Sequence, residues 1–489
     1  MNYKPQHTLI TLIAIASLLG VGFLLFPHNG ISISENITLI FPSINIFNST
    51  EDASDGIIDE DISMEDTLEI ATVEIDSLML NDLFAVEQIK IIKERQNVLK
   101  IQYSDSNLFV LSKFFEALDK VDRFPVRILH YGDSQIEGDR MSGYLRNEFQ
   151  KQFGGTGCGL IPIFETFPTF AIKQSDSGNW KRYAAFFSKN KKPTHQRFGL
   201  MANYSRFTPA VADSLLDVQE STNAWVRFTP NKRTYHRAGK FNKVRMLYGY
   251  NRKPFVTRVF VDDKLVFFDT LDASFSSQTV IWSLADFPAD MKIEFDGVDS
   301  PDIYGISLET PAGVHLDNIG MRGSSGTFFT KLDRAVLKKQ SVELEPNLIL
   351  LQYGGNTVPS IHSKKKAKEY GNWFESQIRL LKRLNPYASI IIIGPSDMSV
   401  EVDGKLQTRK YLEEVRDALK EAAFNTDSGF WDLYEVMGGR NSMISWVEAD
   451  PPLAANDYTH FAPGGAKKLS KLFYTALMDD YKLWKKNLP

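Results

Sequence analysis

Two short segments hold residue types that together could activate a serine. Gly-Asp-Ser at 132–134 follows a mainly apolar run, and Asp-Tyr-Thr-His at 457–460 lies near the C-terminus. A serine hydroxyl is a weak nucleophile until an imidazole accepts its proton, and a carboxylate must fix the tautomer of that imidazole. Asp457 and His460 are close enough in sequence to share one loop. The pattern therefore predicts a proton relay among Ser134, His460 and Asp457.

Two further blocks lie between these segments, Asn-Ile-Gly-Met-Arg-Gly at 318–323 and Tyr-Gly-Gly-Asn at 353–356. Each block alone is a common turn sequence. All four in this order, with the first and third after predicted strands, resemble the SGNH or GDSL hydrolase superfamily over about 125–170 and 313–485. The resemblance implies a serine nucleophile at Ser134 and an oxyanion hole made by three donors: the backbone N–H of Ser134, the backbone N–H of Gly323 and the side chain of Asn356.

The elements that must position these residues alternate between strands and helices. Continuous apolar runs at 348–351 and 390–393 are typical of buried parallel strands, and the apolar spacing of 374–384 predicts a crossover helix between them. Met141, Leu145, Phe149 and Phe153 recur every fourth residue and predict a helix whose first amides would favour negative charge near Ser134. Together with the resemblance, this predicts an α/β fold, an SGNH-type (flavodoxin-like) three-layer parallel sheet.

A different texture interrupts this pattern between the first and second blocks. Short β-branched and aromatic runs separated by turns fill about 170–312, and 255–268 reads as a hairpin. We expect an inserted β-sandwich. A β domain at this place resembles the carbohydrate-binding-like insertion of bacterial peptidoglycan O-acetylesterases.

The N-terminus predicts a membrane anchor. Residues 8–26 contain no charged side chain, and about 20 such residues span a bilayer as a helix. Lys4 precedes the segment and no Lys or Arg follows it until Lys90, so the positive-inside rule orients the rest of the chain outwards. The location expected is a bacterial inner membrane, crossed once, with the catalytic part in the periplasm. A cleaved signal peptide is the alternative, but Leu-Leu-Phe-Pro at 24–27 is bulkier than a cleavage site.

An acidic stretch follows this segment. Eleven acidic and no basic residues lie between Glu51 and Asp76, which predicts a self-repelling spacer. The expected organisation is a cytoplasmic tip and anchor at 1–28, a flexible linker at 29–85, the first part of the hydrolase domain at 86–170, the inserted β-sandwich at 171–312, and the second part of the hydrolase domain at 313–489.

Composition argues against several other classes of protein. A net charge of −4 gives no broad basic surface for nucleic acid, and a single cysteine, Cys158, cannot form an internal disulfide. No convincing metal-ligand spacing occurs and the chemistry needs no cofactor or metal. We expect Cys158 to be a buried small side chain rather than a reactive thiol.

Four residues near the motifs receive structural interpretations. We expect His130 to be a buried structural histidine, Asp133 to accept hydrogen bonds from loop amides, and Glu137 and Asp139 to be solvated loop charges. Thr357 stands where many family members carry Asp, which would alter hydrogen bonding around the site only.

The resemblance implies an esterase that removes O-acetyl groups from peptidoglycan or another envelope polysaccharide through an acyl-serine intermediate. The triad does not distinguish this esterase from a polysaccharide O-acetyltransferase. A non-catalytic glycan-binding protein is a third alternative, against which the intact Ser134, Asp457, His460 and Asn356 argue. The expected partners are an acetylated glycan and the inner membrane, with an envelope acyltransferase as a further candidate. Five aromatic residues are candidate sugar platforms, although core packing is the commoner role of such side chains: Trp180, Trp225, Trp282, Tyr248 and Tyr250.

Overall fold

The computed structural model describes residues 31–34, 37–39, 98–104, 108–164, 167, 169–185 and 195–487. The chain divides into two units, 1–72 and 73–489. In the first unit, β1 (Ile31–Ser34) and β2 (Ile37–Leu39) pair antiparallel inside the predicted linker, where Ile and Ser alternate as in a strand. The predicted anchor at 8–26 and the acidic stretch lie outside the described residues. None of the described helices is both long and apolar enough to cross a membrane.

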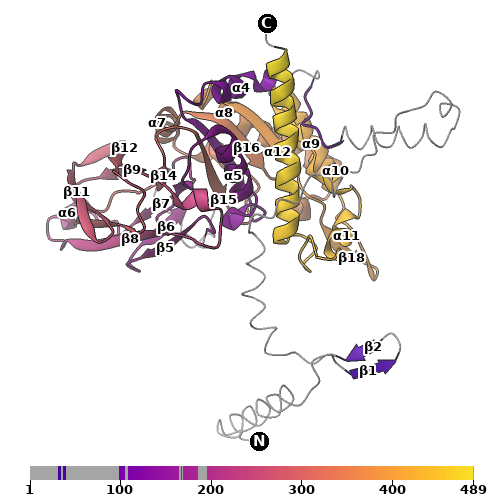
Figure 1. Cartoon of the computed structure of the whole chain (residues 1–489), viewed down its shortest axis with the longest axis horizontal. Helices are drawn as coiled ribbons and strands as arrows, with labels where there is room; N and C mark the ends of the chain where they lie inside the picture. The colour runs from indigo at the N-terminus through magenta and orange to yellow at the C-terminus, as the bar shows by residue number, and fades with distance from the viewer. Residues whose placement is uncertain are drawn as a thin grey trace, which may run out of the picture. The chain divides into compact units, whose positions relative to one another are not determined.

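A five-stranded parallel sheet forms the centre of the second unit (Figure 1). Its spatial order is β15 (Val314–Gly320), β3 (Val126–Gly132), β16 (Pro346–Gln352), β17 (Ser389–Ile393) and β20 (Gly429–Trp431). The first strand in the sequence thus lies between the second and the third. This is the flavodoxin-like order, whose switch point, where a ligand crevice opens at the carboxyl ends of the strands, lies beside β3. The predicted parallel sheet is confirmed.

Helices cover both faces of this sheet and complete three layers. One hydrophobic core includes side chains of α4 (Ser112–Asp119), α5 (Ser142–Phe153) and α12 (Pro463–Lys486). The core on the opposite face includes α7 (Arg334–Leu344), α8 (Lys364–Leu384) and α9 (Leu412–Phe424). Alternate residues of the strands, such as Leu350 and Leu351, belong to opposite cores. Burial of both strand faces explains why these strands are continuously apolar.

The insertion between α5 and β15 is a two-sheet β-sandwich with its own hydrophobic core. One sheet has the order β11-β10-β13-β8-β5 and the other β12-β9-β14-β4. The predicted hairpin is the β10–β11 pair. The strands are β4 (Gly159–Ile161), β5 (Ile172–Asp176), β8 (Thr222–Pro230), β9 (Lys243–Asn251), β10 (Phe255–Val261), β11 (Lys264–Leu271), β12 (Ser274–Ser283), β13 (Met291–Gly297) and β14 (Gly305–Glu309).

The sandwich begins before the predicted boundary at 171. Strand β4 pairs with β14, and Ile161 and Ile163 pack in the sandwich core. A three-residue strand followed by a loop carries too little alternation to be recognised in the sequence, and only its pairing with β14 defines it. A separate pair, β6 (Lys181–Ala184) and β7 (Asn203–Arg206), lies within the insertion.

Buried charges join the sandwich to the central sheet. Arg127 on β3 donates through Nη1 to both carboxylate oxygens of Asp317 on β15, at 2.9 and 2.7 Å, and through Nη2 to Glu309 on β14. The Asp317 carboxylate also accepts from the backbone N–H of Leu160 at 2.7 Å. All three charged side chains are buried. Because unpaired buried charges are costly, this network fixes the position of the insertion.

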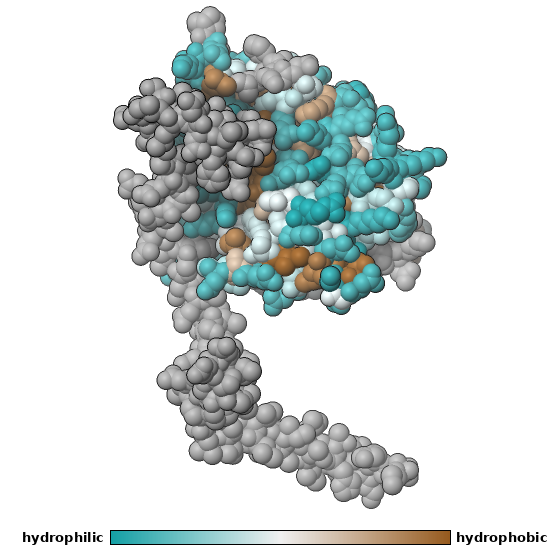
Figure 2. Space-filling model, turned by 90° about the vertical axis from the view of Figure 1, so that its right-hand side faces the viewer, coloured by the Kyte–Doolittle hydropathy of each residue, from teal (hydrophilic) through white to brown (hydrophobic). Residues whose placement is uncertain are grey.

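Smaller elements complete the second unit. They are α6 (Asp213–Leu216) in the insertion, the hairpin β18 (Ser399–Val402) and β19 (Lys405–Thr408), α10 (Leu433–Met437) and α11 (Ser442–Val447). Figure 2 shows one face of the molecule, whose described surface is largely hydrophilic with small hydrophobic areas. Such a surface is ordinary for a folded body in water.

Candidate active site

The serine lies on a tight turn at the carboxyl end of β3. The backbone N–H of Ile136 donates to the carbonyl of Asp133 at 3.3 Å and closes the turn around Ser134. A Cβ on Gly132 would lie 2.9 Å from the Ile136 side chain and 3.1 Å from the Gln352 carbonyl, so a larger residue would have to displace these neighbours. This turn presents Ser134 where an open parallel sheet binds its ligands.

The helix after the serine starts later than the sequence suggested. A 3₁₀ turn, Glu137–Asp139, intervenes, and α5 begins at Ser142. The first amides after Ser134 therefore belong to turns, and the expected placement of the α5 N-terminus at the serine is wrong. The spacing of apolar residues located the body of the helix but could not separate it from a preceding turn.

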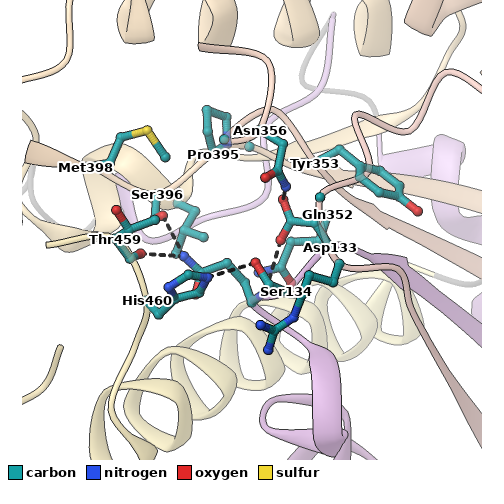
Figure 3. A pocket seen from close by; sticks show the side chains of 16 residues that line it. Asp133, Ser134, Gln352, Tyr353, Asn356, Pro395, Ser396, Met398, Thr459 and His460 are labelled. Carbon is teal, nitrogen blue, oxygen red and sulfur yellow. Dashed lines mark hydrogen bonds between the residues drawn. The ribbon is translucent and has the colours of Figure 1, made fainter. Parts of the chain in front are cut away.

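The structure brings the three predicted relay residues together. Ser134 Oγ lies 2.8 Å from His460 Nε2 (Figure 3). His460 Nδ1 lies 2.6 Å from Asp457 Oδ2. The other carboxylate oxygen of Asp457 accepts the backbone N–H groups of Thr459 and His460 at 3.0 and 2.9 Å. With Nδ1 donating to the carboxylate, Nε2 has its lone pair directed at the serine. The arrangement is competent to take up the hydroxyl proton.

Asp457 is ionised in this arrangement. Partial burial raises its pKa, but the hydrogen bonds from the backbone and ring of His460 and from the backbone of Thr459 outweigh burial and lower the pKa below its usual value. Its side chain is nevertheless 51% exposed. The charged end of the relay therefore faces solvent, while Ser134 is buried.

Gln135 ties the serine turn to the histidine loop, a function that the sequence did not suggest. Its Nε2 donates to the carbonyl of Thr459 at 2.6 Å and to Ser396 Oγ at 3.3 Å, and its Oε1 accepts the backbone N–H of Phe461 at 3.3 Å. Gln135 thus binds the backbone of the residues on either side of His460. Its place beside Ser134 was the only signal available, because its partners lie more than 250 residues away in sequence.

Two backbone donors at the pocket have no acceptor in the part of the chain that the structure describes. Among the described residues, none accepts a hydrogen bond from the backbone N–H of Ser134 or of Gly323, and both residues line the same pocket. Gly323 has φ of 77°, in the left-handed region that favours glycine. Two unengaged N–H groups beside a nucleophile are the donors that an oxyanion requires.

The third predicted donor, Asn356, is engaged in this structure. Its Nδ2 donates to Asp133 Oδ2 at 2.8 Å and more weakly to the carbonyl of Ser324 at 3.3 Å. Asp133 is buried and also accepts the backbone N–H of Gln135 at 3.0 Å, as predicted for a residue that organises the loop. Burial raises the pKa of Asp133 to about 6. Asn356 lines the pocket, but its amide must release Ser324 to donate to an oxyanion.

The pocket around Ser134 is small and mixed in polarity. Its volume is about 240 Å³, below the roughly 300–1,000 Å³ typical of drug-sized ligands. This size suits a short acyl group. The lining residues are Asp133, Ser134, Gln135, Arg322, Gly323, Gln352, Tyr353, Gly355, Asn356, Gly394, Pro395, Ser396, Met398, Leu433, Thr459 and His460.

Arg322 lines this pocket, although its sequence context suggested no role. It donates through Nε to Glu137 at 3.0 Å, and its guanidinium carbon lies 3.7 Å from the centre of the Phe167 ring. Glu137 is therefore buried and paired, and the expectation of a solvated charge is wrong. Asp139 is also buried, where it accepts two hydrogen bonds from Arg146 at 2.6 and 2.8 Å. Arginines distant in sequence or along the following helix carried no signal for these pairs.

Three other residues considered in the sequence, His130, Cys158 and Thr357, are buried within the fold. His130 is buried between Gln352 Oε1 at 3.1 Å and Ser142 Oγ at 2.9 Å, and burial lowers its pKa to about 4, which confirms its structural interpretation. Burial raises the pKa of the Cys158 thiol to about 12, so that thiol is unreactive. Thr357 is buried beside Asn356.

The aromatic candidates in the sandwich are mostly core residues. Trp180, Trp282 and Tyr248 are buried in its hydrophobic core. Trp225 and Tyr250 are partly exposed, and the guanidinium of Arg197 covers the ring of Tyr250 at 4.2 Å. None of the five lines the pocket at Ser134.

Comparisons with known proteins show the fold. No protein-family model and no curated protein matches the chain. A solved peptidoglycan O-acetylesterase is 19% identical, with a TM-score of 0.58 over 78% of this chain and 97% of that one. A family two carbohydrate esterase from Clostridium thermocellum is 9% identical, with a TM-score of 0.23 over 54% and 94% of the two chains, too distant to carry an argument. The chain has the fold of the first of these esterases, which confirms the fold that the resemblance of its four motifs predicted.

Proposed function

We propose that this protein is a serine esterase that removes O-acetyl groups from peptidoglycan or another polysaccharide of the bacterial envelope. The observation that carries the proposal is the continuous relay from Ser134 Oγ through His460 to Asp457, beside two unengaged backbone N–H groups. The small pocket suits an acetyl group, and the fold shared with a peptidoglycan O-acetylesterase supports a glycan as the substrate.

The geometry supports acyl transfer in two steps. Ser134 Oγ attacks the ester carbonyl while His460 Nε2 takes the hydroxyl proton. The backbone N–H groups of Ser134 and Gly323 stabilise the negative oxygen. The Asn356 amide also donates to this oxygen once its hydrogen bond to the Ser324 carbonyl has broken. The sugar oxygen then leaves with the proton from His460, and the acetyl group remains on Ser134. Water then attacks the acetyl-serine while His460 takes its proton, and acetate leaves as His460 returns that proton to Ser134 Oγ.

Solvent access favours hydrolysis over transfer to a sugar. Asp457 is half exposed and the relay opens to water, whereas a transferase must exclude water from its acyl-enzyme. An O-acetyltransferase would pass acetyl groups to an added oligosaccharide instead of releasing acetate. A non-catalytic glycan-binding protein is disfavoured because the relay is assembled.

The location is part of the proposal. The uncharged segment at 8–26 would anchor the chain in the inner membrane, and the acidic linker would hold the esterase within reach of the periplasmic cell wall. An envelope acyltransferase that supplies the acetylated glycan is a candidate partner.

The test is acetate release by the purified full-length chain from O-acetylated peptidoglycan and from acetylated xylan. We expect acetate from peptidoglycan, hydrolysis of p-nitrophenyl acetate, and loss of both in Ser134→Ala with unchanged circular dichroism. A Ser134→Ala protein as active as the wild type would refute the serine mechanism. Release from xylan alone would refute the envelope substrate.

A further inference from the structure

A second hollow adjoins the active-site pocket on the side of α8. Its volume is about 280 Å³, and it shares Gly323 and Asn356 with the pocket at Ser134. A ligand whose ester lies at Ser134 would therefore extend past the oxyanion donors into this hollow. We call it the Trp373 hollow; its lining is Gly323, Ser325, Thr327, Asn356, Thr357, Ser360, Ile361, Lys366, Glu369, Tyr370 and Trp373.

One face of α8 forms a wall of the Trp373 hollow. Lys366, Tyr370 and Trp373 are spaced four and three residues apart and so lie on the same helix face. Tyr370 is buried and its hydroxyl donates to the carbonyl of Ser325 at 2.8 Å, which fixes this wall against the loop that carries Gly323. The hollow thus has a rigid frame.

Trp373 is the unusual residue in that wall. It is 61% exposed, and its indole makes no hydrogen bond or ring contact with any residue that the structure describes. Tryptophan is usually well buried because its large apolar ring is costly to leave in water. Single exposed apolar residues are common on protein surfaces, but this one borders a hollow continuous with a catalytic serine.

Apart from Ile361, the remaining lining is mostly polar and carries no net charge. Ser325 Oγ and Thr327 Oγ1 lie 3.1 Å apart, and Lys366 Nζ pairs with Glu369 Oε2 at 2.7 Å. Hydroxyls can donate and accept, and the ion pair cancels its own charge. A pyranose ring has the complementary surface, with an apolar C–H face that stacks on an aromatic ring and hydroxyls around its edge.

We propose that the Trp373 hollow is a glycan subsite, in which Trp373 stacks on the sugar ring next to the one that bears the acetyl ester. This proposal rests on the esterase function and assigns glycan recognition to the hydrolase domain itself. The sandwich aromatics that the sequence suggested are mostly core residues, whereas Trp373 is exposed beside the reacting serine. Trp373 is a specificity residue and takes no part in the chemistry.

The test compares a small ester with a glycan ester. In the full-length chain, we expect Trp373→Ala to lower kcat/KM for soluble O-acetylated glycan strands from peptidoglycan about tenfold more than kcat/KM for p-nitrophenyl acetate, mainly through KM, since one aromatic contact is worth about that factor. Trp373→Tyr keeps a stacking ring and should retain most of the activity on glycan. Tyr387→Ala is the matched control because Tyr387 is 79% exposed, lies beyond the C-terminal end of α8 and does not line the hollow.

A binding measurement separates this proposal from the esterase function. Calorimetric titration of Ser134→Ala with the same glycan strands should show binding that weakens about tenfold in Ser134→Ala/Trp373→Ala. The subsite would be overturned if the two variants bound with equal affinity or if neither bound. It would also be overturned if Trp373→Ala lowered kcat/KM equally on the glycan ester and on p-nitrophenyl acetate. A wild-type chain without esterase activity, whose Ser134→Ala form still binds through Trp373, would overturn the esterase function and leave the subsite standing.

Discussion

Replacing Asp457 with Asn tests whether the carboxylate sets the tautomer of His460. In the wild type, one oxygen of Asp457 accepts the N–H groups of Thr459 and His460, and the other faces His460 Nδ1. An Asn in the same place must keep its carbonyl on the two N–H groups, because an NH₂ there would oppose two donors. Two hydrogen bonds at about 1 kcal/mol each favour that orientation by roughly 30-fold.

The NH₂ of the introduced amide would then point at His460 Nδ1 and force that nitrogen to act as an acceptor. The ring proton would move to Nε2, which faces Ser134 and could no longer take up the hydroxyl proton. In a buried triad, the wrong histidine tautomer lowers kcat about 10⁴-fold. In this protein a flip of the amide would restore the productive tautomer, so the orientation preference limits that part of the loss to about 30-fold. Loss of the half-exposed carboxylate charge, which stabilises the imidazolium, removes about 30-fold more, so we expect a total loss of about 10³-fold in kcat/KM, or about 4 kcal/mol.

The assay is hydrolysis of p-nitrophenyl acetate by wild type, Asp457→Asn and Asp457→Ala. The Ala variant leaves Nδ1 to water and imposes no tautomer, so it should be more active than the Asn variant. Asp479→Asn, an exposed change on α12, should be as active as the wild type. An Asp457→Asn enzyme that kept more than about a tenth of wild-type kcat/KM would refute the reasoning.

Three further predictions concern the oxyanion donors, the junction and pH. Asn356→Ala should lower kcat about 10²-fold on p-nitrophenyl acetate. Arg127→Met should lower the free energy of unfolding in urea by about 3–5 kcal/mol, because it leaves two buried carboxylates without their shared partner. Burial raises the pKa of Asp480 to about 6, so its contribution to stability is complete below about pH 4 and is lost as the pH rises through about 6. Asp480→Asn should therefore stabilise the fold by about 1–2 kcal/mol at about pH 8 and leave it unchanged at about pH 4.

Each of these has a contradicting outcome. Activity of Asn356→Ala near that of the wild type would mean that the two backbone N–H groups form the oxyanion hole by themselves. An unchanged urea midpoint in Arg127→Met would show that the junction charges do not hold the sandwich. Equal stabilisation by Asp480→Asn at both pH values would show that the benefit arises from packing and not from removal of a buried charge.

The sequence alone was sufficient where the determining interactions are local or repetitive. Buried strands must be apolar on both faces, so β16 and β17 were visible as continuous runs, and the serine and Asn blocks could be placed after strands. Asp457 and His460 belong to one loop in which the carboxylate accepts neighbouring amides, so their pairing follows from three residues of spacing. Parallel strands then bring their carboxyl ends, and with them the first three blocks, to one edge, while the fourth block lies in the loop before α12.

Only the tertiary structure decided which distant side chains meet at that edge. Three contacts join segments that are remote in sequence: the hydrogen bonds from Gln135 to the Thr459 carbonyl, from Asn356 to Asp133 and from Arg322 to Glu137. Trp373 looked like any residue of an amphipathic helix until the loop after β15 formed the other wall of its hollow. Local patterns determine elements because backbone geometry repeats, whereas a contact between elements depends on how the whole chain packs.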